Sequence, residues 1–200
     1  MIKTINTLIL CWIALSYSMA QPRSVALEDY YTPKEILELH KLIQFVNEGI
    51  TKNCDDTQLA CYNKFFNQFN DLKANEDAQI PLSQTGELQL LESLDADIFE
   101  DIWRICEYER FYKKDSSIFL QSICLNPEGR FAKFLIDLKD HHEKLNHYGE
   151  PFKITGLYTP AMNGILLKYH DWFNIESQSE LFLMAVHLLT LNYPEKQLKN

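Results

Sequence analysis

The sequence predicts an all-α protein, a single compact domain of about seven helices that is held by disulfides and follows a cleaved signal peptide. Apolar residues recur at helical spacing over most of the chain. Thr32 and Ser177 each stand three residues before a glutamate, the capping-box pattern that opens helices. Four cysteines lie beyond the predicted signal, and an even number in an exported chain indicates disulfides.

The first twenty residues have the three parts of a secretion signal in order. Lys3 supplies the positive charge, and residues 5–15 form an apolar stretch. That stretch is shorter than the ~20 residues a membrane-spanning helix needs. Ser18 and Ala20 are small, so cleavage is expected before Gln21. We therefore expect a signal peptide at 1–20, a helical domain at 21–200, export to the periplasm or extracellular space, and no stable membrane insertion after cleavage.

The front half of the chain contains two clear helical patterns. The first begins at Pro33, which suits the first helical position, and the second begins at Asp55 or Asp56. Residues 73–86 are polar and predict a loop within the domain. A helix over 86–94 either runs on or breaks near Asp95 into a helix over 96–113. The apolar residues on these patterns are Ile36, Leu39, Ile43, Val46, Ile50, Tyr62, Phe65, Phe66, Ile98, Ile102 and Ile105.

The back half predicts further helices. A turn at 113–116 leads to a helix containing Ile118, Phe119 and Ile123, and a longer helix runs from 126–127 to a stop at Gly149. Residues 149–159 form an irregular, aromatic-rich loop. Thr159-Pro160 starts another helix. The stretch 181–191 is apolar on nearly all sides, so the most buried helix is expected there, with His187 as a hydrogen-bonded core residue.

The spacing of the cysteines suggests how they pair. Cys106 and Cys124 lie nine residues before and nine residues after Asp115, so an antiparallel helical hairpin would bring them to the same height. We predict that they bond, which leaves Cys54 with Cys61 by subtraction. A zinc site is the alternative, but the chain has no C-x₂-C pair and no histidine close in sequence to the four cysteines.

Charge limits the class of partner. The formal net charge is −9, and it becomes −10 without the signal, which contains one lysine and no acid. Nucleic acid and anionic membranes are bound through basic surfaces, so neither is the expected partner. The expected partner is another exported protein, of basic charge.

No catalytic motif is present, and no enzyme activity, cofactor or metal is predicted. His142 and His147 are five residues apart, about 140° around a helix, so they cannot hold one ion together. The chain has no G-x-S-x-G and no glycine-rich phosphate loop. The acids between Asp95 and Glu109 could form a glycosidase pair only if one of them lies in an apolar pocket.

These observations favour an exported, acidic binding protein, of the kind that blocks a basic enzyme or toxin in the bacterial periplasm as an inhibitor or immunity protein does. Exposed aromatic residues on a loop often form a contact site. The hypothesis therefore places anchors on the 149–159 loop and charges that steer the partner on the acidic helix: Phe152, Ile154, Tyr158, Asp97, Glu100 and Asp101. Two alternatives remain, a carrier of a small apolar ligand and a cell-wall hydrolase that uses the acidic residues.

Overall fold

The computed structural model describes residues 25–72, 80, 82–113, 116–141, 143–155 and 159–198. The predicted signal peptide at 1–20 lies outside these residues. The described part is mostly helical, as expected, but it also contains a three-stranded antiparallel sheet. The all-α prediction is therefore wrong in one respect.

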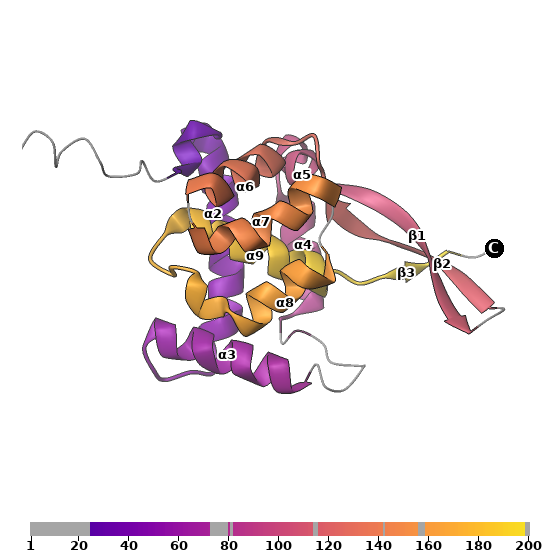
Figure 1. Ribbon diagram of the computed structural model, residues 1–200, viewed down its shortest axis with the longest axis horizontal. Coiled ribbons are helices and arrows are strands. Elements are labelled where there is room, and N and C mark those ends of the chain that lie inside the picture. Colours follow the sequence, from indigo (N-terminus) through magenta and orange to yellow (C-terminus); the bar gives the residue numbers. More distant parts are fainter. Residues whose placement is uncertain are drawn as a thin grey trace, which may run out of the picture.

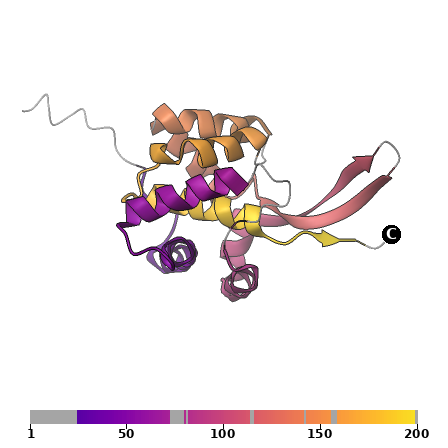
Figure 2. The same ribbon diagram turned by 90° about the horizontal axis from the view of Figure 1, so that it is seen from below.

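The helices form one body, and the two long strands extend away from it (Figure 1). The strand order is β1-β2-β3, with β2 in the middle. Figure 2, turned by 90°, also shows the two long strands extending away from the helices. In chain order the elements are η1 Leu27–Asp29, α2 Pro33–Thr51, α3 Gln58–Leu72, α4 Gln84–Ser93, α5 Ala96–Ile102, β1 Trp103–Lys113, β2 Ser116–Leu125, α6 Arg130–His141, α7 Glu143–Thr155, α8 Pro160–Lys168, η2 His170–Trp172, α9 Gln178–Asn192 and β3 Lys196–Gln197.

The core is built around α9, as the sequence predicts. Residues 182–189 are buried without a break. Phe182 lies among three other aromatic rings, those of Tyr31, Phe131 and Phe134, at centroid distances of 6.0, 5.4 and 5.7 Å. A helix that is buried on all sides needs other elements around it, and the remaining helices supply that cover.

The helix starts follow the capping signals in the sequence. Thr32 and Glu35 form a complete capping box at α2. The hydroxyl of Thr159 accepts a hydrogen bond from the backbone of Met162 at α8. At α9 only half of the predicted box forms: Ser177 caps the helix, while the Glu180 carboxylate accepts from the backbone N–H of Asn174.

The largest correction concerns residues 96–125. The helix expected over 96–113 ends at Ile102, and the chain continues as β1. The residues around Ile118 form β2 instead of a helix. The two strands pair antiparallel, with Trp103 opposite Leu125 at one end and Phe111 opposite Ser117 near the other. Both segments are rich in aromatic and β-branched residues, which suit a pleated sheet.

The second correction concerns the loop expected at 149–159. Residues 149–155 continue α7, with Gly149 and Pro151 inside the helix, and residues 156–158 lie outside the described part. The long helix predicted from 126 instead begins at Arg130 and gives way to α7 after His141. A proline inside a helix removes one hydrogen bond, at a cost of about 3 kcal/mol. Burial of Tyr148 and Phe152 on the core side of α7 offsets that cost.

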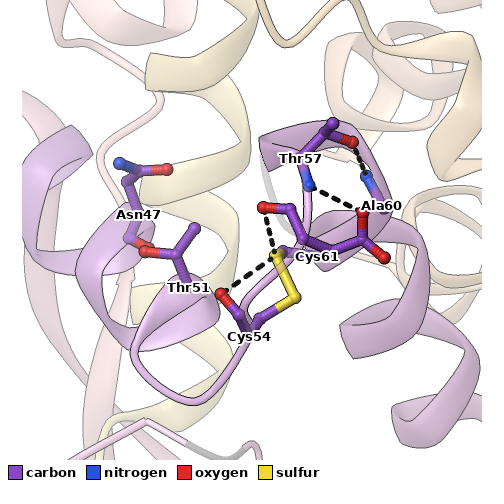
Figure 3. Close-up of a disulfide and its surroundings, with 7 residues drawn as sticks. Asn47, Thr51, Cys54, Thr57, Ala60 and Cys61 are labelled. Carbon is purple, nitrogen blue, oxygen red and sulfur yellow. Dashed lines mark hydrogen bonds between the residues drawn. A yellow bond between two sulfur atoms is a disulfide. The ribbon is translucent and has the colours of Figure 1, made fainter.

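The structure pairs the cysteines as the sequence analysis predicts, Cys54 with Cys61 and Cys106 with Cys124. The first bond joins Cys54, in the turn after α2, to Cys61 in the first turns of α3. It spans Thr57, whose hydroxyl accepts from the backbone N–H of Ala60 (Figure 3). The second bond joins β1 to β2, so the hairpin on which it was predicted is a β-hairpin and not a helical one. Cys106 lies opposite Ser122, so its bond to Cys124 is diagonal, with Cα atoms 5.8 Å apart.

No helix in the described part of the chain is long and apolar enough to cross a bilayer.

Gly129 is needed where the hairpin rejoins the helical body. A Cβ atom at this position would lie 1.8 Å from the backbone oxygen of Asp101. We expect Gly129→Ala to lower the free energy of unfolding by about 2 kcal/mol, because the two segments must separate. Gly164 in α8 is the control, since a Cβ there meets nothing within 4 Å. Gly164→Ala should stabilise by about 0.5–1 kcal/mol. Urea denaturation of both variants tests this, and equal effects would contradict it.

Candidate partner-binding site

The residues predicted as anchors on the 149–159 segment are not brought together on the surface. Phe152 is only 2% exposed and belongs to the core. Ile154 is 76% exposed, near the end of α7. Tyr158 lies outside the described residues. Phe152 is therefore not available to a partner in this conformation, and Ile154 is the described residue of this group that faces solvent.

The three predicted steering acids differ in their surroundings. Asp97 and Glu100 are exposed on α5. Asp101 instead accepts hydrogen bonds from the backbone and the guanidinium of Arg130, at 2.8 and 3.1 Å. Arg130 also bonds to Glu35 at 2.8 Å, and this contact holds the pKa of Glu35 at about 2. Asp101 thus ties α5 to α6, while Asp97 and Glu100 are free to face a partner.

The hairpin presents an exposed face that the sequence analysis did not predict. Side chains alternate between the two faces of a strand. Ile105, Glu107 and Glu109 therefore share one face of β1, and Phe119 lies opposite Glu109 on the same face. Ile105 is 53% exposed and Phe119 is 44% exposed, and both glutamates are exposed. We call these four residues the open face.

The other face of the hairpin contacts the C-terminal segment through side chains. Tyr108 and Arg110 both donate to the carboxylate of Glu195, which lies just before β3. Burial and this hydrogen bond raise the pKa of Tyr108 to about 12. Leu120, in β2, is almost fully buried. The C-terminal segment therefore engages part of this face, on which Arg104 and Arg110 remain exposed.

The root of the hairpin is anchored in the helical body. Trp103 is completely buried, and its indole N–H donates to the Thr190 hydroxyl in α9 at 2.8 Å. At the other strand, Asn126 donates to the backbone oxygens of Ile102 and Glu100. These contacts join the root of the hairpin to the body, and the Cys106–Cys124 bond joins its two strands. A fixed, projecting surface loses little conformational entropy when it binds.

His187 and Glu87 are buried polar residues that lie away from this surface. His187 is hydrogen-bonded to the Tyr148 hydroxyl and, at 2.8 Å, to Asn163, which confirms the prediction of a satisfied core histidine. Glu87 is completely buried and accepts from Asn192 at 2.6 Å, while its second oxygen has no hydrogen-bond partner in the described part. Burial raises the pKa of Glu87 to about 7. Nothing in the sequence around Glu87 signals this burial.

The described residues supply no metal-binding group. Within the ranges given above, no three His, Cys, Asp or Glu side chains lie close enough together to hold an ion. His142 and the side chain of His141 lie outside the described part. The buried carboxyl of Glu87 has the raised pKa of a general acid, but its complete burial keeps a polysaccharide substrate from reaching it in this conformation.

No protein-family model, no curated protein and no solved structure matches this chain.

Proposed function

We propose that this chain is an exported binding protein that docks onto a basic exported protein through its β-hairpin and blocks it, as an inhibitor or immunity protein does. The observation that carries the proposal is the open face. It combines two exposed apolar side chains, Ile105 and Phe119, with two exposed carboxylates on a disulfide-linked hairpin that projects from the helical body (Figure 1). Buried apolar anchors supply most of the lasting affinity in protein interfaces, and surrounding charges steer the encounter.

The charge of the chain supports a basic partner. Asp97 and Glu100 lie on α5, which runs directly into β1, so four exposed acids occur within one continuous stretch of chain. Removal of the predicted signal leaves a net charge of −10. Complementary charge of this kind raises the association rate with a cationic surface. The two disulfides are in keeping with an exported protein.

The test begins with capture of the partner from the exported fraction of the native organism, followed by binding kinetics with variants. Ile105→Ala and Phe119→Ala should each weaken binding by about 2 kcal/mol, or roughly thirtyfold, mainly through faster dissociation. The neutral pair Glu107→Gln and Glu109→Gln should slow association and reduce its dependence on salt.

Ile154 provides the matched control, because it is an exposed isoleucine on a different element. Ile154→Ala should leave the dissociation rate unchanged. If Ile154→Ala weakens binding while the hairpin variants do not, the end of α7 is the docking site and the hairpin is not. If a lipid or a sugar binds in place of a protein, the proposed class is wrong.

A further inference from the structure

The outer edge of β1 has no strand beside it in the described part of the chain. The sheet has the order β1-β2-β3, so no described strand pairs with that edge of β1. β1 has 11 residues and contains no proline. An unpaired edge of this length is a template for another extended segment, and natural proteins usually shield such edges. The opposite edge of the sheet already holds an extended segment, β3.

The ladder shows which residues of β1 direct their backbone groups to this edge. In an antiparallel pair, alternate residues bond to the partner strand and the residues between them point away. Asn126 donates to the oxygen of Ile102 at 2.8 Å, in the register that β1 and β2 share. The even-numbered residues of β1 therefore bond to β2, and Ile105, Glu107 and Glu109 point outward.

A second hydrogen bond leads to the same assignment. Phe119 is paired with Glu109, and its backbone oxygen accepts from Leu198 at 3.0 Å, on the side away from β1. Glu109 and Phe119 are thus a pair that is not hydrogen-bonded, so the N–H and C=O of Glu109 face outward. The three residues whose backbone groups face outward, Ile105, Glu107 and Glu109, are also the residues whose side chains form the β1 half of the open face.

Charge indicates what kind of segment fits this edge. On the open face, the neighbours of a strand added beside β1 would be Ile105, Glu107 and Glu109, all exposed. On the other face they would be Arg104, Cys106, Tyr108 and Arg110. β3 offers a comparison within the chain, since Lys196 lies opposite Gln121, which in turn lies opposite Glu107 and donates to it. Opposite charges on neighbouring strands contribute about 0.2–1 kcal/mol per pair, whereas like charges oppose pairing. The two glutamates therefore favour a segment with basic residues opposite them. An antiparallel second copy centred on Glu107 would instead set Glu107 against Glu107 and Arg104 against Arg110.

We infer that the outer edge of β1 binds an extended basic segment of the partner as a fourth strand, with lysine or arginine opposite Glu107 and Glu109 and an apolar residue opposite Ile105. This mode deepens the proposed function and rests on it. Main-chain hydrogen bonds supply affinity in strand addition, and the alternate side chains supply specificity.

The test uses the full chain and a synthetic probe. The probe is a capped seven-residue peptide with lysine at its second and fourth positions, valine at its sixth and threonine elsewhere. We expect it to bind, and to protect the amides of Ile105, Glu107 and Glu109 from hydrogen exchange. N-methylation of the two lysines removes the N–H groups that face β1 and should weaken binding at least tenfold. N-methylation of two threonines, on the opposite edge of the same peptide, should leave binding unchanged.

Two protein variants separate the backbone from the charge. Glu107→Pro removes an outward N–H but no hydrogen bond of the β1–β2 ladder, and it should weaken binding at least tenfold. Glu107→Gln keeps the N–H and should weaken binding about threefold. The methylated peptides give the result independently if Glu107→Pro does not fold.

The outcomes distinguish this inference from the proposed function. If the unmodified probe does not bind, or if the two methylated peptides bind equally well, strand addition is overturned. The proposed function still stands if Ile105→Ala and Phe119→Ala weaken binding to the captured partner. A peptide with glutamate in place of lysine that binds as well as the probe overturns the assignment of a basic segment.

Discussion

Trp103→Ala is expected to lower the free energy of unfolding by about 3–5 kcal/mol. Trp103 is the first residue of β1, yet its side chain is completely buried and packs against Phe99 at a centroid distance of 5.7 Å. Alanine would leave a cavity in the core and would remove the hydrogen bond to the Thr190 hydroxyl. The loss should be seen as a lower midpoint in guanidinium denaturation, with the slope of the transition unchanged.

Trp172 is the matched control, because it is only half-buried, in η2, where it stacks on Tyr169. Trp172→Ala should cost less than about 2 kcal/mol, since less apolar surface is lost and water fills the gap. A loss below about 1 kcal/mol for Trp103→Ala would mean that the hairpin root does not lie in the core. The open face would then not be held rigidly.

The helices were predictable because their signals are local. Thr32 and Ser177 act on N–H groups three residues away, and the apolar run of α9 is continuous in the sequence. Glycine and proline were less reliable guides. Gly149 and Pro151 predict a break, but the burial of neighbouring residues keeps α7 helical through both. Tertiary contacts, and not local propensity, therefore determine that α7 continues through Gly149 and Pro151.

The hairpin was not predicted because the apolar residues just before and at its start also fit the spacing of a helix. Ile98, Ile102 and Ile105 are spaced four and three apart, which fits a helix as far as Ile105. The true boundary lies at Ile102, and the strand is stabilised by contacts from remote parts of the chain. For example, Arg110 donates a hydrogen bond to Glu195, which lies 85 residues later in the sequence. The content of aromatic and β-branched residues on both sides of the 113–116 turn was the available signal for two strands.

The cysteine spacing predicted the right bonds on the wrong element. Two positions almost equally far from a turn meet in any antiparallel hairpin, whether it is helical or extended. The expected Cys106–Cys124 bond therefore did not depend on the secondary structure. The open face did depend on it, because helical spacing does not bring Ile105, Glu107 and Glu109 to one face, whereas a strand does.

Glu87→Gln is expected to change how stability depends on pH. Glu87 is 0% exposed, and burial raises its pKa from the ordinary value of 4.5 to about 7. Below pH 4.5 the carboxyl is protonated in both the folded and the unfolded chain. Between pH 4.5 and 7 the carboxyl ionises in the unfolded chain, which lowers the free energy of that state. In the folded chain the carboxyl stays protonated, so the folded state is not stabilised in the same way. The native protein should therefore lose on the order of 3 kcal/mol of stability across this window, with no further loss above it.

Glutamine has no proton to release, so the variant should lack this loss, and the difference between the two proteins should grow from pH 4 to pH 8 in favour of the variant. Subtracting the two stability curves cancels the histidines, which titrate in the same window in both proteins. Glu35 does not interfere, because its pKa is lowered to about 2 and its effect falls below pH 4.5. The glutamine oxygen can still accept from Asn192, as the carboxylate does at 2.6 Å. Parallel curves for the two proteins would mean that Glu87 is ionised, and hence hydrated, in the folded chain.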